Sequence, residues 1–235
     1  MVSCWQLAMR WLLALLLLLP LAAQARPVDV ALVLAVDSSS SVDREEFTLQ
    51  MQGLAEAFRD PDVQARLIAG PHGAVAVTVM EWSNADWQVV AEPWRVIAST
   101  EDAEALAADL VDAPRRIWGG ATAIGAALAR AAELLAAAPV TAARRVIDLS
   151  GDGAPSDARR LARERARLSA AGITVNGLAI LDDDSALPEI FRRDVALGPG
   201  SFVIVAAGYK DFARAMRMKL LQELQPGPLA QSLQP

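Results

Sequence analysis

The sequence predicts a doubly wound α/β fold, a Rossmann-like arrangement in which a mostly parallel sheet with one antiparallel edge strand carries helices on both faces. Short apolar runs alternate with longer segments of helical periodicity, which is typical of strands joined by crossover helices. Residues 28–36 are almost continuously apolar, as expected for a central strand covered on both sides. Two further apolar runs flank a short turn at residues 83–85, which predicts a hairpin at the sheet edge.

The first helix is predicted after the serine-rich segment that follows the strand at residues 28–36. Acidic residues occupy its first turn, where the helix dipole favours negative charge. We expect this helix to end near Asp60 and Pro61. Four apolar side chains spaced by four, three and four residues define its buried face, namely Phe47, Met51, Leu54 and Phe58.

The hairpin supplies the antiparallel edge of the predicted sheet. Its strands are expected at residues 74–82 and 86–90, and a short helix follows at residues 101–110. The next helix is predicted from residue 124 to a point before Pro139. Its apolar face repeats the spacing of four, three and four residues through Ile124, Leu128, Ala131 and Leu135.

The last third of the chain predicts three more strands, at residues 145–149, 173–181 and 202–206. We expect Ser156 and Asp157 to cap a helix that runs to about residue 171, and a final helix to cover residues 209–221. Asn176 and Gly177 could instead signal a hairpin turn. A buried strand is favoured there because the helix before it and the apolar run after it fit a βαβ unit.

The first 25 residues have the pattern of a signal peptide. Arg10 precedes an apolar run at residues 11–19, and Ala23-Gln24-Ala25 fits a signal-peptidase site, so we expect cleavage before Arg26. A membrane anchor is the alternative, but Pro20 closes the apolar core before it reaches the roughly 20 residues of a spanning helix.

No later run in the sequence is long and apolar enough to cross a bilayer. We therefore expect a protein that is exported to the periplasm or secreted, with no membrane span in the mature chain. It would carry one domain at residues 26–224 and a disordered tail at residues 225–235.

Charge and cysteine content exclude several classes of function. The formal net charge is -6 at pH 7, and removal of Arg10 makes it more negative, which argues against a nucleic-acid partner. Cys4 is the only cysteine and lies in the segment expected to be removed, so a disulfide or a thiolate metal site is not expected. His72 is the only histidine, and serine-hydrolase chemistry is therefore unsupported.

Polar side chains cluster where three predicted elements begin or end. Asp37, Ser39 and Ser41 follow the first strand, Thr122 opens the helix at residue 124, and Asp152 follows the strand at residues 145–149. Ligands of an open parallel sheet bind beyond the carboxyl ends of its strands, so we expect these side chains to converge. Two carboxylates and three hydroxyls offer only hard oxygen atoms, which suits Mg²⁺ or Mn²⁺ and leaves a coordination position open.

Each polar residue also has a local alternative. Ser40 or Ser41 could cap the first helix, Thr122 could cap the helix that it precedes, and Asp152 could form an Asx turn before Gly153. Capping and metal ligation are compatible for the serines.

The motifs resemble the metal-ion-dependent adhesion site of von Willebrand factor A (VWA) domains. The resemblance rests on DxSxS from Asp37 to Ser41, GxTxxGxAL at residues 120–128, and Asp152-Gly153, and it covers residues 28–221. Gly151 departs from the family pattern because threonine or serine usually precedes this aspartate. Asp148 departs from it because an apolar strand residue is usual there. Residues 145–153 and 173–180 resemble, more narrowly, a group of exported bacterial VWA proteins of unknown function.

The resemblance implies a binding protein rather than an enzyme. An acidic side chain of a partner protein would complete the coordination of Mg²⁺ or Mn²⁺, and the surrounding loops would set specificity. We expect Trp118, Ser83 and Asn84 on the rim of this site, although Trp118 could instead be partly buried under the adjacent helix. The resemblance also implies that the final helix could shift when the site is occupied.

Two other functions fit parts of the sequence. Asp152 between two glycines resembles the acidic metal loop of haloacid-dehalogenase-like, Mg-dependent phosphatases, with Asp37 as nucleophile. However, Ser39 stands where that chemistry needs a second aspartate as general acid. It also needs a basic residue, typically lysine, before the acidic loop to hold the phosphate, and both lysines of this chain come after the loop. Alternatively, a VWA scaffold with a purely structural metal would bind its partner through an arginine-rich helix, although a solvated helix face is the simpler interpretation. That helix carries Arg159, Arg160, Arg163, Arg165 and Arg167.

Overall fold

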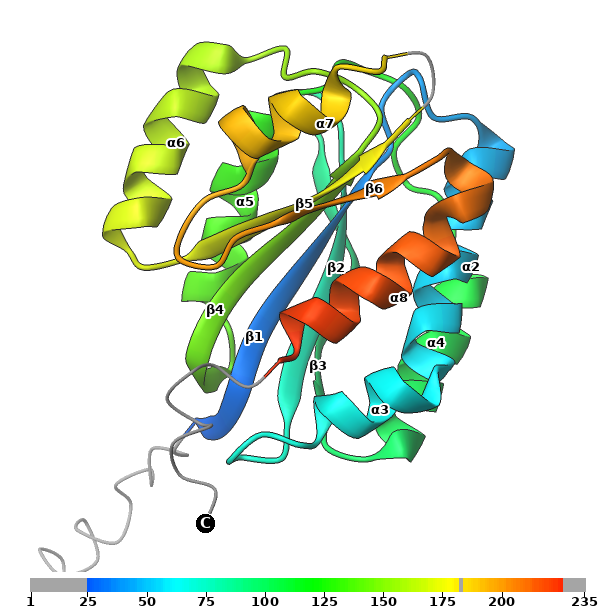
Figure 1. The fold of residues 1–235 in the computed structure, drawn as a ribbon, viewed down its shortest axis with the longest axis vertical. Helices are drawn as coiled ribbons and strands as arrows, with labels where there is room; N and C mark the ends of the chain where they lie inside the picture. Colours follow the sequence, from blue (N-terminus) through cyan, green and yellow to red (C-terminus); the bar gives the residue numbers. More distant parts are fainter. Residues whose placement is uncertain (1–24, 182–183, 226–235) are drawn as a thin grey trace, which may run out of the picture.

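A computed structural model describes residues 25–181 and 184–225 and confirms the predicted sheet (Figure 1). Its strand order is β3-β2-β1-β4-β5-β6, and β3 is antiparallel to β2 while the other neighbouring pairs are parallel. The predicted signal peptide and residues 226–235 of the predicted tail lie outside the described residues. The strands are β1 (Arg26–Asp37), β2 (Val75–Trp82), β3 (Gln88–Ile97), β4 (Val140–Gly151), β5 (Thr174–Ile180) and β6 (Val203–Ala206).

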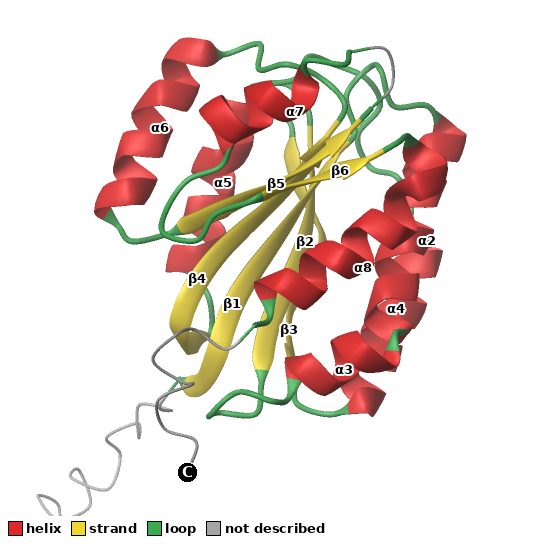
Figure 2. Ribbon diagram, viewed as in Figure 1, coloured by secondary structure: helices red, strands yellow, loops and turns green. Residues whose placement is uncertain are grey.

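Helices cover both faces of the sheet (Figure 2). One face carries α2 (Arg44–Arg59), α3 (Pro61–Leu67), α4 (Thr100–Asp112) and α8 (Phe212–Glu223). The other face carries α5 (Ile124–Ala136), α6 (Ala158–Ala170) and α7 (Leu187–Ile190). In the described part of the chain, no helix combines the length and apolar character needed to cross a membrane.

The central strand β1 serves two separate cores. Side chains of a strand point alternately to its two faces. Leu32 and Leu34 accordingly pack with α2 and α8, whereas Val33 and Ala35 pack with α5. Because both neighbours of β1 are parallel to it, the loops that follow β1 and β4 emerge side by side at one end of the sheet.

Two helical segments were not predicted. Helix α3 begins immediately after α2 because Asp60 ends the first helix and caps the second, its carboxylate accepting from Asp62 N and Val63 N. Helix α7 continues into a π-helical turn (Phe191–Val195) whose apolar side chains are buried against the sheet. The Asn176-Gly177 pair lies inside β5, so the hairpin alternative is wrong there.

Two helix caps differ from the prediction. Asp43, rather than Ser40 or Ser41, caps α2: its carboxylate accepts from Glu46 N, while the Glu46 carboxylate accepts from Asp43 N. Asp157 occupies the N-cap position of α6 but does not cap that helix with its side chain. Its carboxylate instead accepts from the amides of Gly125 and Ala126 at the start of α5.

A cluster of buried charges joins α8 to the sheet, and we call it the latch cluster. The Lys219 ammonium lies 3.2 Å from Asp148 Oδ1, and both side chains are almost completely buried. The Glu223 carboxylate accepts from Asn176 Nδ2 at 2.6 Å and lies 3.5 Å from Arg144 Nη2. Burial raises the pKa of Asp148 and brings the pKa of Glu223 to about 7. Asp148, which departs from the family pattern, thus faces a built-in cation.

Candidate metal centre

The first loop of the site begins where β1 ends. Ser39 N donates to Asp37 Oδ1 at 2.8 Å, and Gln50 Nε2 of α2 donates to the Asp37 carbonyl at 3.0 Å. Asp37 is 0% exposed and Ser39 is 1% exposed. The strand, the turn and α2 therefore fix the Asp37 carboxylate beneath the surface.

Asp152, in the loop after β4, meets the first loop through hydrogen bonds. Ser41 Oγ donates to Asp152 Oδ1 at 2.7 Å, and Ser39 Oγ lies 3.2 Å from Ser41 Oγ. The Tyr209 hydroxyl donates to Asp152 Oδ2 at 2.7 Å. Four of the five predicted metal ligands are thus brought together in one group.

Thr122 reaches the same place from the loop before α5. Gly119 and Gly120 both have positive φ, at 82° and 104°, which side chains disfavour. Ser40 N donates to the Gly120 carbonyl, and Gly120 N donates to Ser40 Oγ. A β-carbon on Gly153 would lie 3.1 Å from Thr122 Oγ1, so Thr122 lies beside the residue that follows Asp152.

The electrostatics of this group favour a cation. Burial, followed by the nearby Asp152 carboxylate, raises the pKa of Asp37 to about 7. Asp37 Oδ2 is buried without a hydrogen-bond partner, and within residues 25–181 and 184–225 neither carboxylate forms a salt bridge. A buried carboxylate oxygen with no donor is costly unless something else satisfies it.

The donor set fits a hard divalent cation. Two carboxylates and three hydroxyls are oxygen ligands of the kind that Mg²⁺ and Mn²⁺ prefer. No group of three or more His, Cys, Asp or Glu residues suited to a metal occurs among the described residues. Any cation bound here would therefore depend on the hydroxyl groups as well as the two carboxylates.

Gly151 departs from the family pattern for a structural reason. A β-carbon at this position would lie 2.9 Å from Asp37 Oδ2 and 3.3 Å from the ring of Trp82. The indole of Trp82 is fully buried and fills the space that a side chain at residue 151 would need. Glycine therefore avoids the close contact with Asp37 Oδ2 that a β-carbon would make.

The Arg115 side chain holds the first loop in place by binding the backbone carbonyls of that loop. The guanidinium donates to the carbonyls of Asp43, Ser38 and Ser39 at 2.9, 3.1 and 3.4 Å. The buried Glu81 carboxylate secures the same region by accepting from Ser38 Oγ and from the amides of residues 116 and 117. The position of the loop is thus set by protein contacts.

The three predicted rim residues lie in different environments. Trp118 is 54% exposed, and its ring is stacked against the guanidinium groups of Arg44 and Arg115. Asn84 is partly exposed, and its Oδ1 accepts from Ala121 N. Ser83 is fully buried beneath the loop at residues 119–123. The prediction that Ser83 lies on an accessible rim is therefore wrong.

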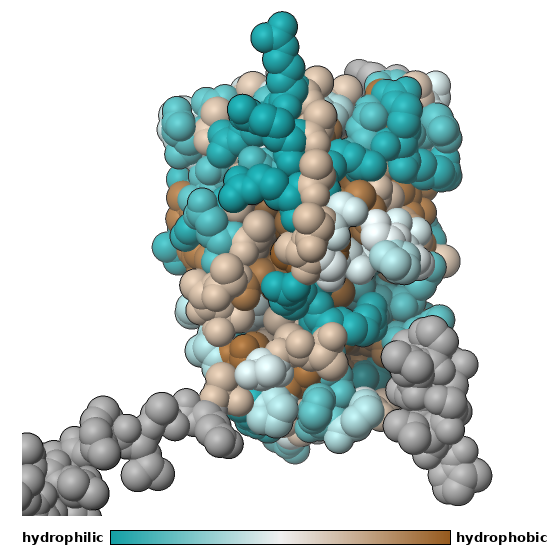
Figure 3. All heavy atoms as spheres, turned by 90° about the vertical axis from the view of Figure 1, so that its left-hand side faces the viewer, coloured by the Kyte–Doolittle hydropathy of each residue, from teal (hydrophilic) through white to brown (hydrophobic). Residues whose placement is uncertain are grey.

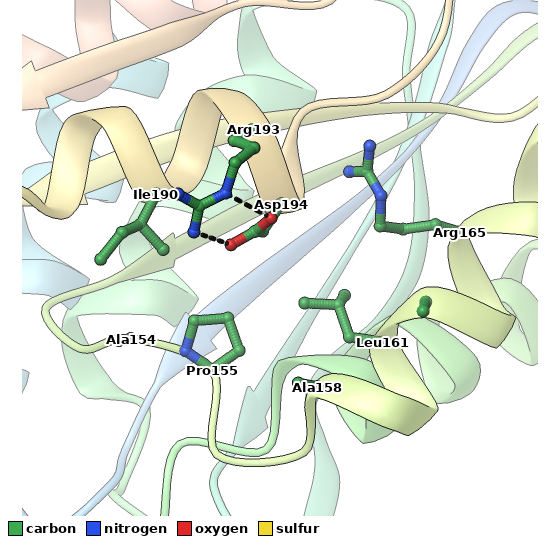
Figure 4. Close-up of a pocket in the computed structure, with 9 residues that line it drawn as sticks. Ala154, Pro155, Ala158, Leu161, Arg165, Ile190, Arg193 and Asp194 are labelled. Carbon is green, nitrogen blue, oxygen red and sulfur yellow. Dashed lines mark hydrogen bonds and ion pairs between the residues drawn. The ribbon is translucent and has the colours of Figure 1, made fainter.

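Three of the five arginines on α6 have a hydrogen-bond partner, and one of these three is paired with a carboxylate. Figure 3 shows the side of the molecule that carries α6, with hydrophilic residues concentrated on its upper half. Arg167 pairs with Glu164, and Arg165 donates to the Ala196 carbonyl. A pocket of about 320 Å³ lies between α6 and the π-helical turn, where Arg193 is paired with Asp194 (Figure 4).

Two contributors to the site were missed at the sequence level. Tyr209, the only tyrosine, follows β6 at the same edge of the sheet as Asp37 and Asp152, and this position was an available signal. Burial, followed by the nearby Asp152 carboxylate, holds the pKa of Tyr209 well above its usual range, so it remains a donor. Arg115 carried no such signal, because its contacts to carbonyl groups depend on the folded loop.

Comparison with known proteins places the chain in a family and identifies its fold. A family model described as "Protein of unknown function (DUF1194)" matches residues 27–228. No curated protein matches the chain significantly. Solved structures of VWA domains share the fold, which confirms the fold expected from the motifs.

Three of these structures illustrate the likeness. A von Willebrand factor type A protein from Catenulispora acidiphila is 20% identical, with a TM-score of 0.59, over 84% of this chain and 43% of that one. The vWF domain of the type V pili tip protein Mfa5 from Porphyromonas gingivalis is 14% identical, with a TM-score of 0.55, over 85% of this chain and 97% of that one.

The third is proximal thread matrix protein 1 from the mussel byssus, whose adhesion motif is occupied by zinc. It is 17% identical, with a TM-score of 0.57, over 83% of this chain and 46% of that one. The chain thus spans less than half the length of two of these three proteins.

Proposed function

The chain belongs to the family of proteins of unknown function designated DUF1194, and we propose that it is an exported binding protein with a metal-ion-dependent adhesion site. Asp37, Ser39, Ser41, Thr122 and Asp152 would hold Mg²⁺ or Mn²⁺. A bound cation supplies an open coordination position that attracts a carboxylate of a partner protein. The protein residues position that carboxylate and restrict its approach.

One observation carries this proposal. Asp37 and Asp152 lie close together with no salt bridge to either one among the described residues, and Asp37 Oδ2 has no hydrogen-bond partner. Hydroxyl groups from Ser39 and Ser41 adjoin them. Two carboxylate charges match a divalent cation, and the hydroxyls complete only part of its coordination.

The likeness to other VWA proteins supports a binding role. The pilus tip protein Mfa5 contains a domain of this fold, and the mussel protein carries zinc at its adhesion motif. Export of this chain would follow from the predicted signal peptide at residues 1–25, which leaves the domain at residues 26–224 and the tail at residues 225–235. Amino-terminal sequencing of the exported protein should begin at Arg26.

Thermal unfolding with and without metal tests the site directly. We expect Mg²⁺ or Mn²⁺ to raise the unfolding temperature of the mature protein relative to a chelator. At 100 times the dissociation constant, binding stabilises the folded state by about 2.7 kcal/mol. The Asp37→Asn variant should lose this response, whereas Asp112→Asn, on the exposed end of α4, should retain it. An equal response in all three proteins would disprove the assignment.

A further inference from the structure

An exposed groove flanks the candidate metal centre, and we call it the aromatic groove. It has a volume of about 210 Å³ and lies between α2 and the segment after α4. Trp118 is 54% exposed and Val111 is 45% exposed, which makes them two of the five large apolar side chains exposed in the described chain. The main lining residues are Arg44, Phe47, Met51, Val111, Arg115 and Trp118.

The aromatic groove and the metal loop belong to one rigid unit. Trp118 directly precedes Gly119 and Gly120, and Gly120 exchanges two hydrogen bonds with Ser40. Arg115 lines the groove and also donates to the carbonyls of Ser38 and Ser39. A segment that coordinates the metal through one side chain can therefore reach a preformed surface with its neighbours.

Arg44 supplies an available positive charge in this groove. Its guanidinium stacks over the Trp118 ring at 5.2 Å, and no hydrogen bond or ion pair of this side chain occurs in the described structure. Arg115 also lies over the ring, at 4.8 Å, but its donors are taken by backbone carbonyls. Arg44 therefore keeps its donors for a ligand, and stacking orients it without neutralising it.

The other flank of the metal centre has the opposite charge. A pocket of about 450 Å³ next to Tyr209 is lined by Asp43, Glu45 and Glu46, with Lys210 as its only basic residue. An acidic ligand is repelled by this flank and attracted by Arg44 on the other side. Charge complementarity of this kind orients a ligand as it approaches.

We propose that the aromatic groove selects partner segments in which the metal-binding acidic residue is accompanied by an apolar side chain and a second acidic residue. The apolar side chain packs on Trp118 and Val111, and the second carboxylate pairs with Arg44. This inference rests on the proposed function, because it assumes that the first carboxylate binds the metal. The opposite charges of the two flanks of the metal centre orient the ligand.

Selection from random short peptides displayed on phage tests the inference on the mature protein loaded with Mn²⁺. The wild type should enrich peptides that carry two acidic residues near an apolar one, and a chelator should release them. Arg44→Glu, at the first turn of α2 where an acidic residue is tolerated, should enrich peptides with a single acidic residue. A peptide selected on the wild type should bind Arg44→Glu or Trp118→Ala about fivefold more weakly.

Arg163→Glu is the matched control, because Arg163 is an exposed arginine on α6. Its affinity for the selected peptide should equal that of the wild type. Equal, chelator-sensitive binding by wild type, Arg44→Glu and Trp118→Ala would overturn the groove while leaving metal-dependent capture intact. Binding that survives the chelator but weakens in Arg44→Glu would support the groove and reject metal capture. Selection of no peptide by the wild type would overturn both.

Discussion

Two pairs of buried carboxylates lie near β4, and they differ in how their charge is balanced. In the latch cluster, Asp148 faces Lys219 at 3.2 Å, and Glu223 faces Arg144 at 3.5 Å. In the metal centre, Asp37 and Asp152 adjoin hydroxyls and backbone amides instead. One pair forms salt bridges to cationic side chains of the chain, and the other forms none within the described residues.

On the proposed function, the difference separates a cluster that stabilises the fold from a cluster that binds a ligand. Buried charges are tolerated when a partner charge or several hydrogen bonds compensate them. The latch cluster meets this condition through its ion pairs, although the Asp148 oxygens and Lys219 Nζ form no regular hydrogen bond, and it joins α8 to β4 and β5. The metal centre meets it only in part, because among the described residues neither Asp37 nor Asp152 has a salt bridge, and Asp37 Oδ2 has no hydrogen-bond partner. On the proposed function, that deficit is where an added cation would lower the free energy of the folded state.

Removing the built-in cation of the latch cluster should have the largest effect. Lys219→Met keeps an unbranched apolar side chain that is one atom shorter, but leaves Asp148 and Glu223 buried with less compensation. Breaking a buried ion pair in this way typically costs about 3–5 kcal/mol. We expect a loss of this size in the free energy of unfolding from chemical denaturation near neutral pH.

Lys210→Met provides the control, because Lys210 is the only other lysine and is exposed. It should change stability by less than about 0.5 kcal/mol. Both variants should keep their response to added metal if they fold. A Lys219→Met variant as stable as the wild type would show that the latch cluster does not depend on its cation.

The sign of the pH dependence offers a second way to test the latch cluster. Burial raises the pKa of Glu223 to about 7 from its ordinary value of 4.5, so the folded protein binds a proton more tightly than the unfolded chain. The resulting stability is fully present below pH 4.5 and is lost as the pH rises through about 7. This shift in the pKa of Glu223 corresponds to a change of roughly 3 kcal/mol at most in the free energy of unfolding.

Glu223→Gln should therefore flatten the decline in stability between about pH 5 and pH 8. The comparison is made in chelator by chemical denaturation at several pH values, so that metal binding does not contribute. Asp37 adds a slope of the same sign, but it is present in both proteins and cancels in the difference. Equal slopes for the two proteins would show that Glu223 does not titrate in this range.

Periodicity and local sequence signals predicted most of the fold. They did not predict residues that end one helix and cap another, or that cap a helix distant in sequence. The apolar spacing of α2 and α5 marked both helices correctly, and the alternation of segments predicted the parallel sheet. Asp60 was interpreted as the end of a helix, because a sequence does not show that one residue ends α2 and caps α3. Asp157 was assigned to the nearer helix, whereas its carboxylate caps α5 from another part of the chain.

The metal ligands were proposed from motifs, but their surroundings depend on tertiary contacts. Asp148 stood out as a polar strand residue, yet nothing near it in sequence pointed to Lys219. Ser83 was expected at an exposed hairpin tip, but the loop at residues 119–123 covers it. Arg44 was part of no motif, and only the folded structure shows that its guanidinium lies over Trp118 beside the metal centre.

The smallest expected effect concerns the space that keeps the metal centre open. Gly151→Ala places a β-carbon 2.9 Å from Asp37 Oδ2, and overpacking of this kind costs about 1–3 kcal/mol. Gly177→Ala is the matched control, because its β-carbon would lie 2.8 Å from the Phe191 ring, beside Asn176 of the latch cluster. In thermal unfolding with and without Mn²⁺, both variants should be destabilised, but only Gly151→Ala should lose the stabilisation by metal. A full metal response in Gly151→Ala would mean that a cation does not need the space around Asp37 Oδ2.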